Sequence, residues 1–159
     1  MGKILVYTFF SYTKVTSKGL FKFEDPNYSF DKLFVSNRFA TKKLLEKAPE
    51  YDFVIGIADH NKNAVKSRFD PKYINKYSGR TLLENGLEIL NSNLEIELPA
   101  NFYLYKGVTN GPCNRSAYLI MNKILSDSYK TKFGFFHLNK KTWENDLKVI
   151  VDNIKSKYL

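Results

Sequence analysis

The single cysteine of this sequence, Cys113, falls where a reactive thiol would be expected. It follows an apolar run at 101–108 and an Asn110-Gly111-Pro112 turn, and apolar residues at helical spacing follow it. Proline is favoured at the first helical position because it lacks the N–H that would be unpaired there. Cys113 would then lie in the first helical turn, where free N–H groups and the helix dipole stabilise a thiolate. The same N–H groups could bind an oxyanion.

His137 is the candidate partner of this thiol. It lies near the end of the next predicted strand, 132–138. If the two strands and the helix between them form a right-handed crossover, Cys113 and His137 meet at the carboxyl-terminal edge of adjacent strands. A thiol beside an imidazole suits acyl transfer, because the imidazole accepts the thiol proton and later protonates the leaving amine. The alternative is structural: a small buried cysteine and a packing histidine.

Several segments together resemble the pyroglutamyl peptidase I (pyrrolidone carboxyl peptidase) family. GPCNRSAY at 111–118 resembles the Cys-Asn-x-x-x-Tyr motif around the nucleophile, and FGFFHL at 133–138 resembles the segment that carries the catalytic histidine. ILVYTFFSYT at 4–13 is similar to the family's opening strand and loop, and FVIGIA at 53–58 to the strand before its acidic residue. The resemblance implies a cysteine peptidase that removes N-terminal pyroglutamate (5-oxoproline), or a related small cap, from peptides.

The resemblance also implies roles for individual residues. Cys113 would be the nucleophile and His137 the base, with no metal or cofactor required. Phe9 and Tyr12 match the two aromatic residues that hold the pyroglutamyl ring in the family. Arg80 lies near the position of a family arginine close to the reaction centre, which suggests substrate binding.

The acid of the triad is matched less closely. One alignment places Asp70 where the family has a glutamate, whereas an ungapped alignment places Phe69 there. Aspartate is one methylene shorter than glutamate, so Asp70 reaches the imidazole only if the backbone lies closer. Asp59 and Glu84 are the other acids that could stand beside His137.

Other departures from the family leave a second function open. The segment between 75 and 101 is much shorter than in family members, and Ser11 replaces a proline. Part of the usual pocket wall or subunit interface would then be absent. The alternative function is that of a diverged, catalytically altered or inactive member that acts as a binding protein.

The order of the predicted elements favours an α/β protein. Strands and amphipathic helices alternate in the second half of the chain, which predicts a three-layer α/β/α sandwich of the phosphorylase/hydrolase-like kind, with a mostly parallel central sheet. The segments 10–37 and 59–79 are polar and rich in turn-forming residues, so we expect them to be irregular, and 80–98 to hold short strands. The main predicted strands are 3–9, 51–58, 101–108 and 132–138, and the helices are 38–47, 113–130 and 140–158.

Length and composition limit the number of domains, the cellular location and the kinds of partner that the sequence predicts. The 159 residues suit a single domain, 1–159, and one cysteine allows no intrachain disulfide, which fits a cytoplasmic location. No apolar run is long enough to span a membrane, so no membrane association is expected. The net charge is +9, but the lysines are scattered, so nucleic acid is not the expected partner. A peptide substrate is expected, and a homo-oligomer is left open.

Overall fold

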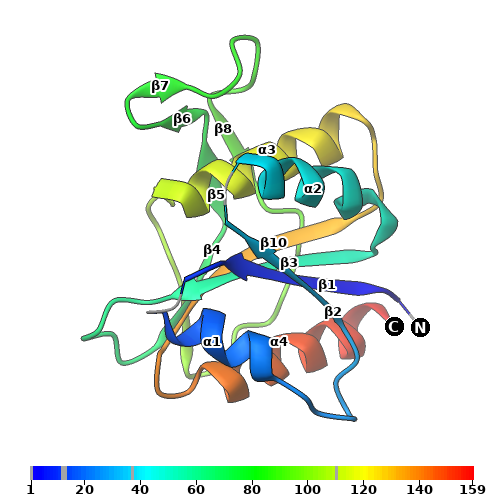
Figure 1. Cartoon of the computed structure of the whole chain (residues 1–159), viewed down its shortest axis with the longest axis vertical. Coiled ribbons are helices and arrows are strands. Elements are labelled where there is room, and N and C mark those ends of the chain that lie inside the picture. The colour runs from blue at the N-terminus through cyan, green and yellow to red at the C-terminus, as the bar shows by residue number, and fades with distance from the viewer. Residues whose placement is uncertain (1, 12–13, 37, 110) are drawn as a thin grey trace.

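One mixed sheet forms the centre of the protein. The computed structural model describes residues 2–11, 14–36, 38–109 and 111–159. Within these ranges the central sheet has six strands in the order β2-β1-β3-β10-β4-β9 (Figure 1). The strands are β1 (Ile4–Phe9), β2 (Asp31–Val35), β3 (Phe53–Asp59), β4 (Ser67–Asp70), β9 (Phe102–Leu104) and β10 (Lys132–Leu138).

The sheet is parallel except at one end. β2, β1, β3 and β10 run in one direction, β4 is antiparallel to β10, and β9 is parallel to β4. The inner strands β1, β3 and β10 consist almost entirely of apolar residues, as expected for strands that are covered on both faces. The carboxyl ends of β1, β3 and β10 therefore share one edge of the sheet.

Two pairs of helices cover the sheet. α2 and α3 lie on one face and α1 and α4 on the other (Figure 1), which makes the three layers expected from the sequence. A short 3-10 turn, η1 (Ala48–Glu50), joins α2 to β3. The helices are α1 (Val15–Lys22), α2 (Arg38–Lys47), α3 (Gly111–Ser126) and α4 (Trp143–Tyr158). None of the helices in the described ranges is long and apolar enough to cross a bilayer.

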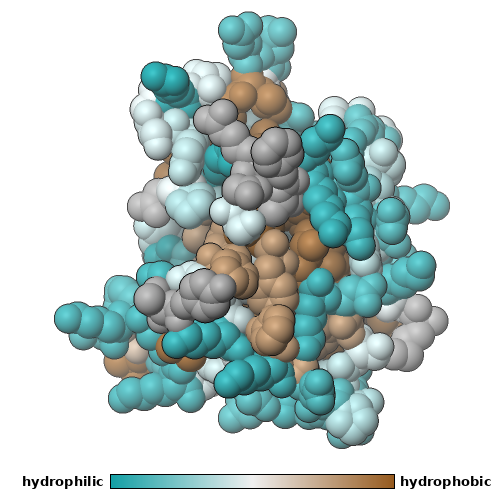
Figure 2. Space-filling model, viewed as in Figure 1, coloured by the Kyte–Doolittle hydropathy of each residue, from teal (hydrophilic) through white to brown (hydrophobic). Residues whose placement is uncertain are grey.

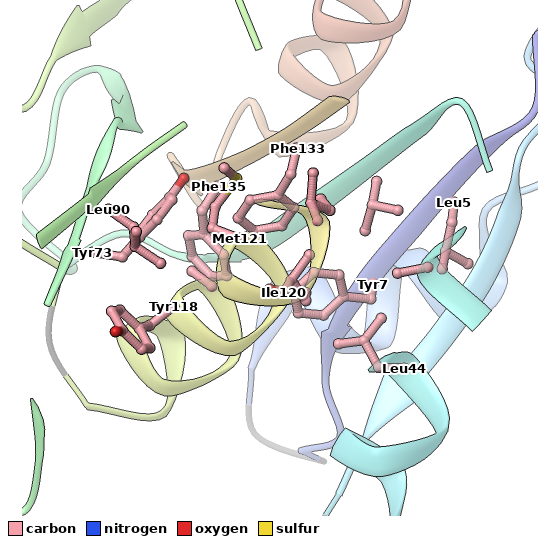
Figure 3. Close-up of a cluster of buried hydrophobic side chains, with 14 of the residues drawn as sticks. Leu5, Tyr7, Leu44, Tyr73, Leu90, Tyr118, Ile120, Met121, Phe133 and Phe135 are labelled. Atoms are coloured by element: carbon pink, nitrogen blue, oxygen red, sulfur yellow. The ribbon is translucent and has the colours of Figure 1, made fainter. Parts of the chain in front are cut away.

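Each face of the sheet has its own hydrophobic core. On the α3 face, Tyr7 and Phe133 stack with their ring centroids 6.4 Å apart, and Met121 of α3 packs in the same cluster (Figure 3). On the α4 face, Phe69 stacks on Phe136 at 4.8 Å. Successive residues within a strand point to opposite faces, as Phe135 and Phe136 of β10 do. This alternation determines which side chains of β4 and β10 lie on the α3 side.

A small excursion separates β4 from β9. It holds two short antiparallel pairs, and one of them extends beyond α3 at the top of Figure 1. The strands are β5 (Lys72–Ile74), β6 (Lys76–Tyr77), β7 (Arg80–Thr81) and β8 (Ile89–Asn91).

The predicted architecture is confirmed: all four main strands belong to the central sheet, and the predicted helices pack on it. Two expectations are wrong. The segment 10–37 contains α1 and β2, and the segment 59–79 contains β4, a strand of the central sheet. α1 buries only Thr16, Ser17 and Leu20, so its apolar periodicity is too weak to mark a helix. β4 is polar because two of its residues belong to the site described below.

The expected crossover from β9 through α3 to β10 is also wrong. β4 lies between β9 and β10, and β9 runs antiparallel to β10. The amino-terminal end of α3 nevertheless lies near the carboxyl end of β10, since Pro112 and Cys113 line one pocket with His137.

Candidate active site

Asp70 and His137 come from neighbouring strands and contact each other. Asp70 Oδ2 lies 3.0 Å from His137 Nδ1. β4 and β10 pair with Asp70 opposite Phe135 and with Arg68 opposite His137. Because alternate residues of a strand share a face, Arg68, Asp70 and His137 all lie on the α3 side of the sheet. An Nδ1–H that donates to Asp70 leaves Nε2 as the basic nitrogen of the ring.

A hydrogen-bond network holds the Asp70 carboxylate, which is fully buried. Arg68 approaches it with both ends of its fork, Nε at 2.8 Å from Oδ1 and Nη2 at 3.2 Å from Oδ2. Thr109 Oγ1 donates to Oδ2 at 2.6 Å. The Arg68 guanidinium in turn lies 4.0 Å from the ring centroid of Tyr105. The hydrogen bonds from Arg68 Nη2 and Thr109 therefore both end on Oδ2, while Nε adds an ion-pair contact to Oδ1; neither Nε nor Oδ1 has a hydrogen-bond partner within the described residues.

Sequence reasoning missed Arg68 and Thr109. A signal for Arg68 was present, because it precedes Asp70 by two residues in a strand and so shares its face. That signal could be used only once 67–70 was recognised as a strand. Thr109 lies in a loop, 39 positions from Asp70, and no local pattern connects the two.

Cys113 lies in the first turn of α3, as the sequence predicted. Gly111 begins the helix with φ at +59°, a left-handed conformation that favours glycine. Asn114 then fixes this end of the helix: its Oδ1 accepts from Ile74 N at 2.8 Å, and its Nδ2 donates to the carbonyls of Ile74 and Lys76 at 2.9 and 2.8 Å. The residue after the candidate nucleophile thus connects α3 to the β5–β6 segment.

Cys113 and His137 line the same pocket, a cavity of about 250 Å³ at the carboxyl edge of the sheet. Its walls come from β1, the start of α1, the end of β3, the start of α3 and β10. The lining residues are Thr8, Phe9, Ser11, Lys14, Thr16, Ser17, Ala58, Asp59, Pro112, Cys113 and His137. The chain therefore brings the candidate nucleophile and base together, with Asp70 behind the base.

The state of the thiol differs from the sequence expectation. Burial raises the pKa of Cys113 to about 12, and the negative charge of Asp70 acts in the same direction. Among the residues that the structure describes, no hydrogen bond joins Cys113 to His137. The helix terminus predicts a lowered pKa for this thiol, whereas burial of the side chain acts in the opposite direction.

Of the three substrate-binding residues expected from the resemblance, only one lines the pocket within the described residues. Phe9 lines the pocket and is half-buried. Tyr12 lies outside the described residues. Arg80 is exposed on β7, opposite Tyr77 of the hairpin, and does not line the pocket. The arginine next to the Asp70–His137 pair is Arg68.

Two further polar residues belong to this pocket. Asp59 accepts from the backbone N–H groups of Thr16 and Val15 at 2.8 and 3.0 Å, and so caps the start of α1. This acid therefore serves a helix rather than His137. The hydroxyl of Thr16 is buried and has no hydrogen-bond partner within the described part of the chain. A ligand in the pocket could supply that partner.

The second histidine is engaged elsewhere. His60 Nδ1 accepts from Asn61 N at 2.8 Å, and Nε2 lies 2.9 Å from the Tyr103 hydroxyl. Its ring centroid is 6.2 Å from that of His137, and burial lowers its pKa. His60 therefore packs beside the site with both nitrogens occupied. The described residues contain no group of three or more histidine, cysteine or acidic side chains suited to a metal ion.

The fold and the site together define a class: α/β sandwiches with a cysteine, a histidine and an acid at the carboxyl edge of a mostly parallel sheet. Within that class, the chain has the fold of the pyrrolidone carboxyl peptidases. It is similar to pyroglutamyl peptidase I of Bacillus amyloliquefaciens, with a TM-score of 0.82, 13% identity and 98% of each chain covered.

Two other solved structures show the same likeness. A mutant pyrrolidone carboxyl peptidase from the hyperthermophile Pyrococcus furiosus has a TM-score of 0.79 at 14% identity, covering 99% of this chain and 100% of that one. The enzyme of Fervidobacterium islandicum has a TM-score of 0.78 at 13% identity, covering 98% of this chain and 99% of that one. No protein-family model and no curated protein matches the sequence. At this identity the comparison establishes the fold, which fits a diverged chain.

Proposed function

We propose that this protein is a cysteine peptidase that releases N-terminal pyroglutamate from peptides. The observation that carries the proposal is the contact of Asp70 with His137 Nδ1 behind a pocket that Cys113 and His137 both line. The shared fold with pyroglutamyl peptidases supports the substrate class. In this proposal Cys113 and His137 are catalytic, and Asp70 positions the imidazole.

The reaction is an acyl transfer in two steps. Cys113 Sγ attacks the pyroglutamyl carbonyl carbon while His137 Nε2 takes the thiol proton, and backbone N–H groups of the first turn of α3 bind the oxyanion. The peptide C–N bond breaks, and His137 returns the proton to the leaving amine. Water then hydrolyses the thioester with His137 again as base. Because burial raises the pKa of the Cys113 thiol, we infer that the proton moves as the bond to carbon forms, without a preformed thiolate.

The pocket suits a small lactam. Phe9 would lie against the ring, as the resemblance implies, with Tyr12 as its proposed counterpart. The unpaired Thr16 hydroxyl is available to hydrogen-bond a polar atom of the lactam. Arg80 does not line the pocket, and the arginine near the reaction centre is Arg68. In this proposal Arg68 holds Asp70 in position and does not contact the substrate.

The test is hydrolysis of a chromogenic pyroglutamyl amide by the purified protein, with the matching prolyl amide as control. We expect turnover of the first substrate only, and loss of that turnover after prolonged alkylation and in the Cys113→Ala variant. Turnover that survives in Cys113→Ala would contradict the proposal.

A second candidate function has its own supporting observation. The raised pKa of Cys113 and the missing Cys113–His137 hydrogen bond suit a catalytically silent member that binds a capped peptide. In that case the pyroglutamyl peptide would bind and remain intact, and Cys113→Ala would retain the affinity. Calorimetric titration with a pyroglutamyl peptide, followed by mass analysis of that peptide, separates the two functions.

A further inference from the structure

A second groove lies next to the pocket that holds Cys113 and His137. It has a volume of about 440 Å³ and is formed by the start of the loop after β1, by α1 and by the edge strand β2. Ser11 and Ser17 line both cavities, so the groove and the pocket are neighbours. A peptide whose first residue occupies the pocket could therefore place its next residues in this groove.

The floor of the groove is aromatic and partly exposed. Phe21 of α1 is 71% exposed and meets Phe34 of β2 edge to face, with centroids 5.9 Å apart. Phe10 contributes a third ring to the lining. Apolar side chains also gather in the middle of the molecular face shown in Figure 2. An exposed cluster of aromatic rings is suited to an apolar or aromatic side chain.

The rim of the groove is basic. Lys18 and Lys22 lie one turn apart on α1, and Lys14 immediately precedes the helix, so the three lysines form one stripe at this end of the groove. Lys18 and Lys22 line the groove, and Lys14 lines the neighbouring pocket. Within the described ranges, none of the three ammonium groups has a carboxylate at ion-pair distance, and the groove has no acidic lining residue.

We propose that this groove binds the leaving part of the substrate, and that the preferred substrates are pyroglutamyl dipeptides with an aromatic second residue and a free carboxylate. This rests on the proposed function. The aromatic side chain lies on Phe21 and Phe34, and the carboxylate faces the lysine stripe. The lysines at the rim of the groove are positive, and the whole chain has a net charge of +9. A free carboxylate on the substrate is therefore favoured by charge complementarity.

The test compares kcat/KM for four substrates: pyroglutamyl-phenylalanine, pyroglutamyl-alanine and the C-terminal amide of each. We expect a preference of about tenfold for phenylalanine over alanine and of about fivefold for the acid over the amide, with the second preference reduced by salt. Phe21→Ala should reduce only the first preference, and the double variant Lys18→Gln/Lys22→Gln only the second.

Matched surface variants serve as controls. Leu125 is 52% exposed on α3, and Lys130 is exposed in the loop before β10, at the opposite edge of the sheet. Leu125→Ala and Lys130→Gln should leave both preferences intact, and unfolding temperatures check that all variants fold.

The outcomes are distinguishable. If all four substrates are cleaved with equal efficiency, or if the groove variants behave like the controls, the groove proposal is wrong and the peptidase function stands. If the native protein cleaves none of the four, the proposed function fails and the groove proposal fails with it.

Discussion

Asp70 has two opposite effects on the site. In the proposed mechanism it orients His137 through Nδ1, whereas its charge raises the pKa of the Cys113 thiol and so disfavours a resting thiolate. In the proposed mechanism the raised pKa of the thiol means that Cys113 gives up its proton to His137 only as it attacks a bound carbonyl. A resting thiol of this kind would also be protected from adventitious oxidation and alkylation.

Replacing Asp70 by asparagine should therefore change two rates in opposite directions. Pyroglutamyl amide turnover should fall by roughly 10⁴-fold, because asparagine lacks the negative charge that stabilises the imidazolium and its amide NH₂ can hold the imidazole in the wrong tautomer. Iodoacetamide labelling of Cys113 at a fixed pH should become faster, because removal of the negative charge lowers the thiol pKa while Arg68 remains nearby. Labelling of the native protein should rise by about tenfold per pH unit below the thiol pKa.

Labelling rates measured between neutral and alkaline pH, in both proteins, check this prediction. If labelling and turnover both slow in the variant, Asp70 supports Cys113 reactivity directly and our account of its charge is wrong. Unchanged turnover would remove Asp70 from the catalytic group.

The unpaired hydroxyl of Thr16 gives a second prediction. Thr16→Val removes a buried polar atom that has no partner in the described part of the chain, so stability should be unchanged or increase by about 1 kcal/mol. The kcat/KM for pyroglutamyl substrates should nevertheless fall by roughly fivefold, since one hydrogen bond to the lactam is lost. Thermal unfolding and kinetics of the same preparation measure both effects.

Thr131 provides the matched control. Its hydroxyl is buried but donates to the Tyr51 carbonyl at 2.9 Å. Thr131→Val should lower stability and leave kcat/KM unchanged, the reverse of Thr16→Val. If the Thr16 variant is destabilised with unaltered kinetics, the hydroxyl has a structural role instead.

At the scale of elements, Asn114 holds the start of α3. Its three hydrogen bonds to Ile74 and Lys76 are all to backbone groups. Asn114→Ala should lower the free energy of unfolding by about 3 kcal/mol, because these groups lose their partners in a buried place. Turnover should also fall, since the N–H groups proposed to bind the oxyanion belong to the same helical turn. Urea unfolding measures the first effect.

Asn153 on α4 is the control for this variant. It makes one bond, from Nδ2 to the Val149 carbonyl at 3.0 Å. Asn153→Ala should cost about 1 kcal/mol or less and leave turnover unaltered. Equal effects in the two variants would mean that Asn114 contributes no more than an ordinary helix residue.

The elements also explain what the sequence could predict. β1, β3 and β10 are buried on both faces and form continuous apolar runs, so they were predicted well. β4 carries Arg68 and Asp70, whose charges satisfy each other inside the site, and its composition therefore indicated a loop. The antiparallel position of β4 between β10 and β9 depends on contacts distant in sequence, and no local pattern encodes it.

The same reasoning applies to the site. Cys113, His137 and Phe9 could be located because they lie at element ends or within a recognisable motif. Asp70 was located through the resemblance, and its contact with His137 follows from strand pairing. Burial around Cys113 could not be foreseen, because the sequence shows where a helix starts but not what packs over its first turn. The helix start therefore predicted a lowered thiol pKa, whereas burial raises it.

At the scale of the molecule, the site is built from both halves of the chain. β1 and α1 supply one wall of the pocket, and α3 and β10 supply the two candidate catalytic groups. The lysines along α1 adjoin this wall, so part of the positive charge of the chain lies where the peptide substrate would bind. Chemistry and substrate preference would thus be carried by different segments of one sheet edge.

The most direct test of the central claim is to trap the acyl-enzyme. The protein is mixed with an activated pyroglutamyl ester, quenched in acid and digested with trypsin, which cuts after Lys106 and Arg115 and releases Cys113 in the peptide 107–115. We predict that this peptide gains the mass of one pyroglutamyl group, that the gain is absent in Cys113→Ala, and that it forms far more slowly in His137→Gln. Turnover without acylation of Cys113, or acylation that is equally fast without His137, would contradict the account.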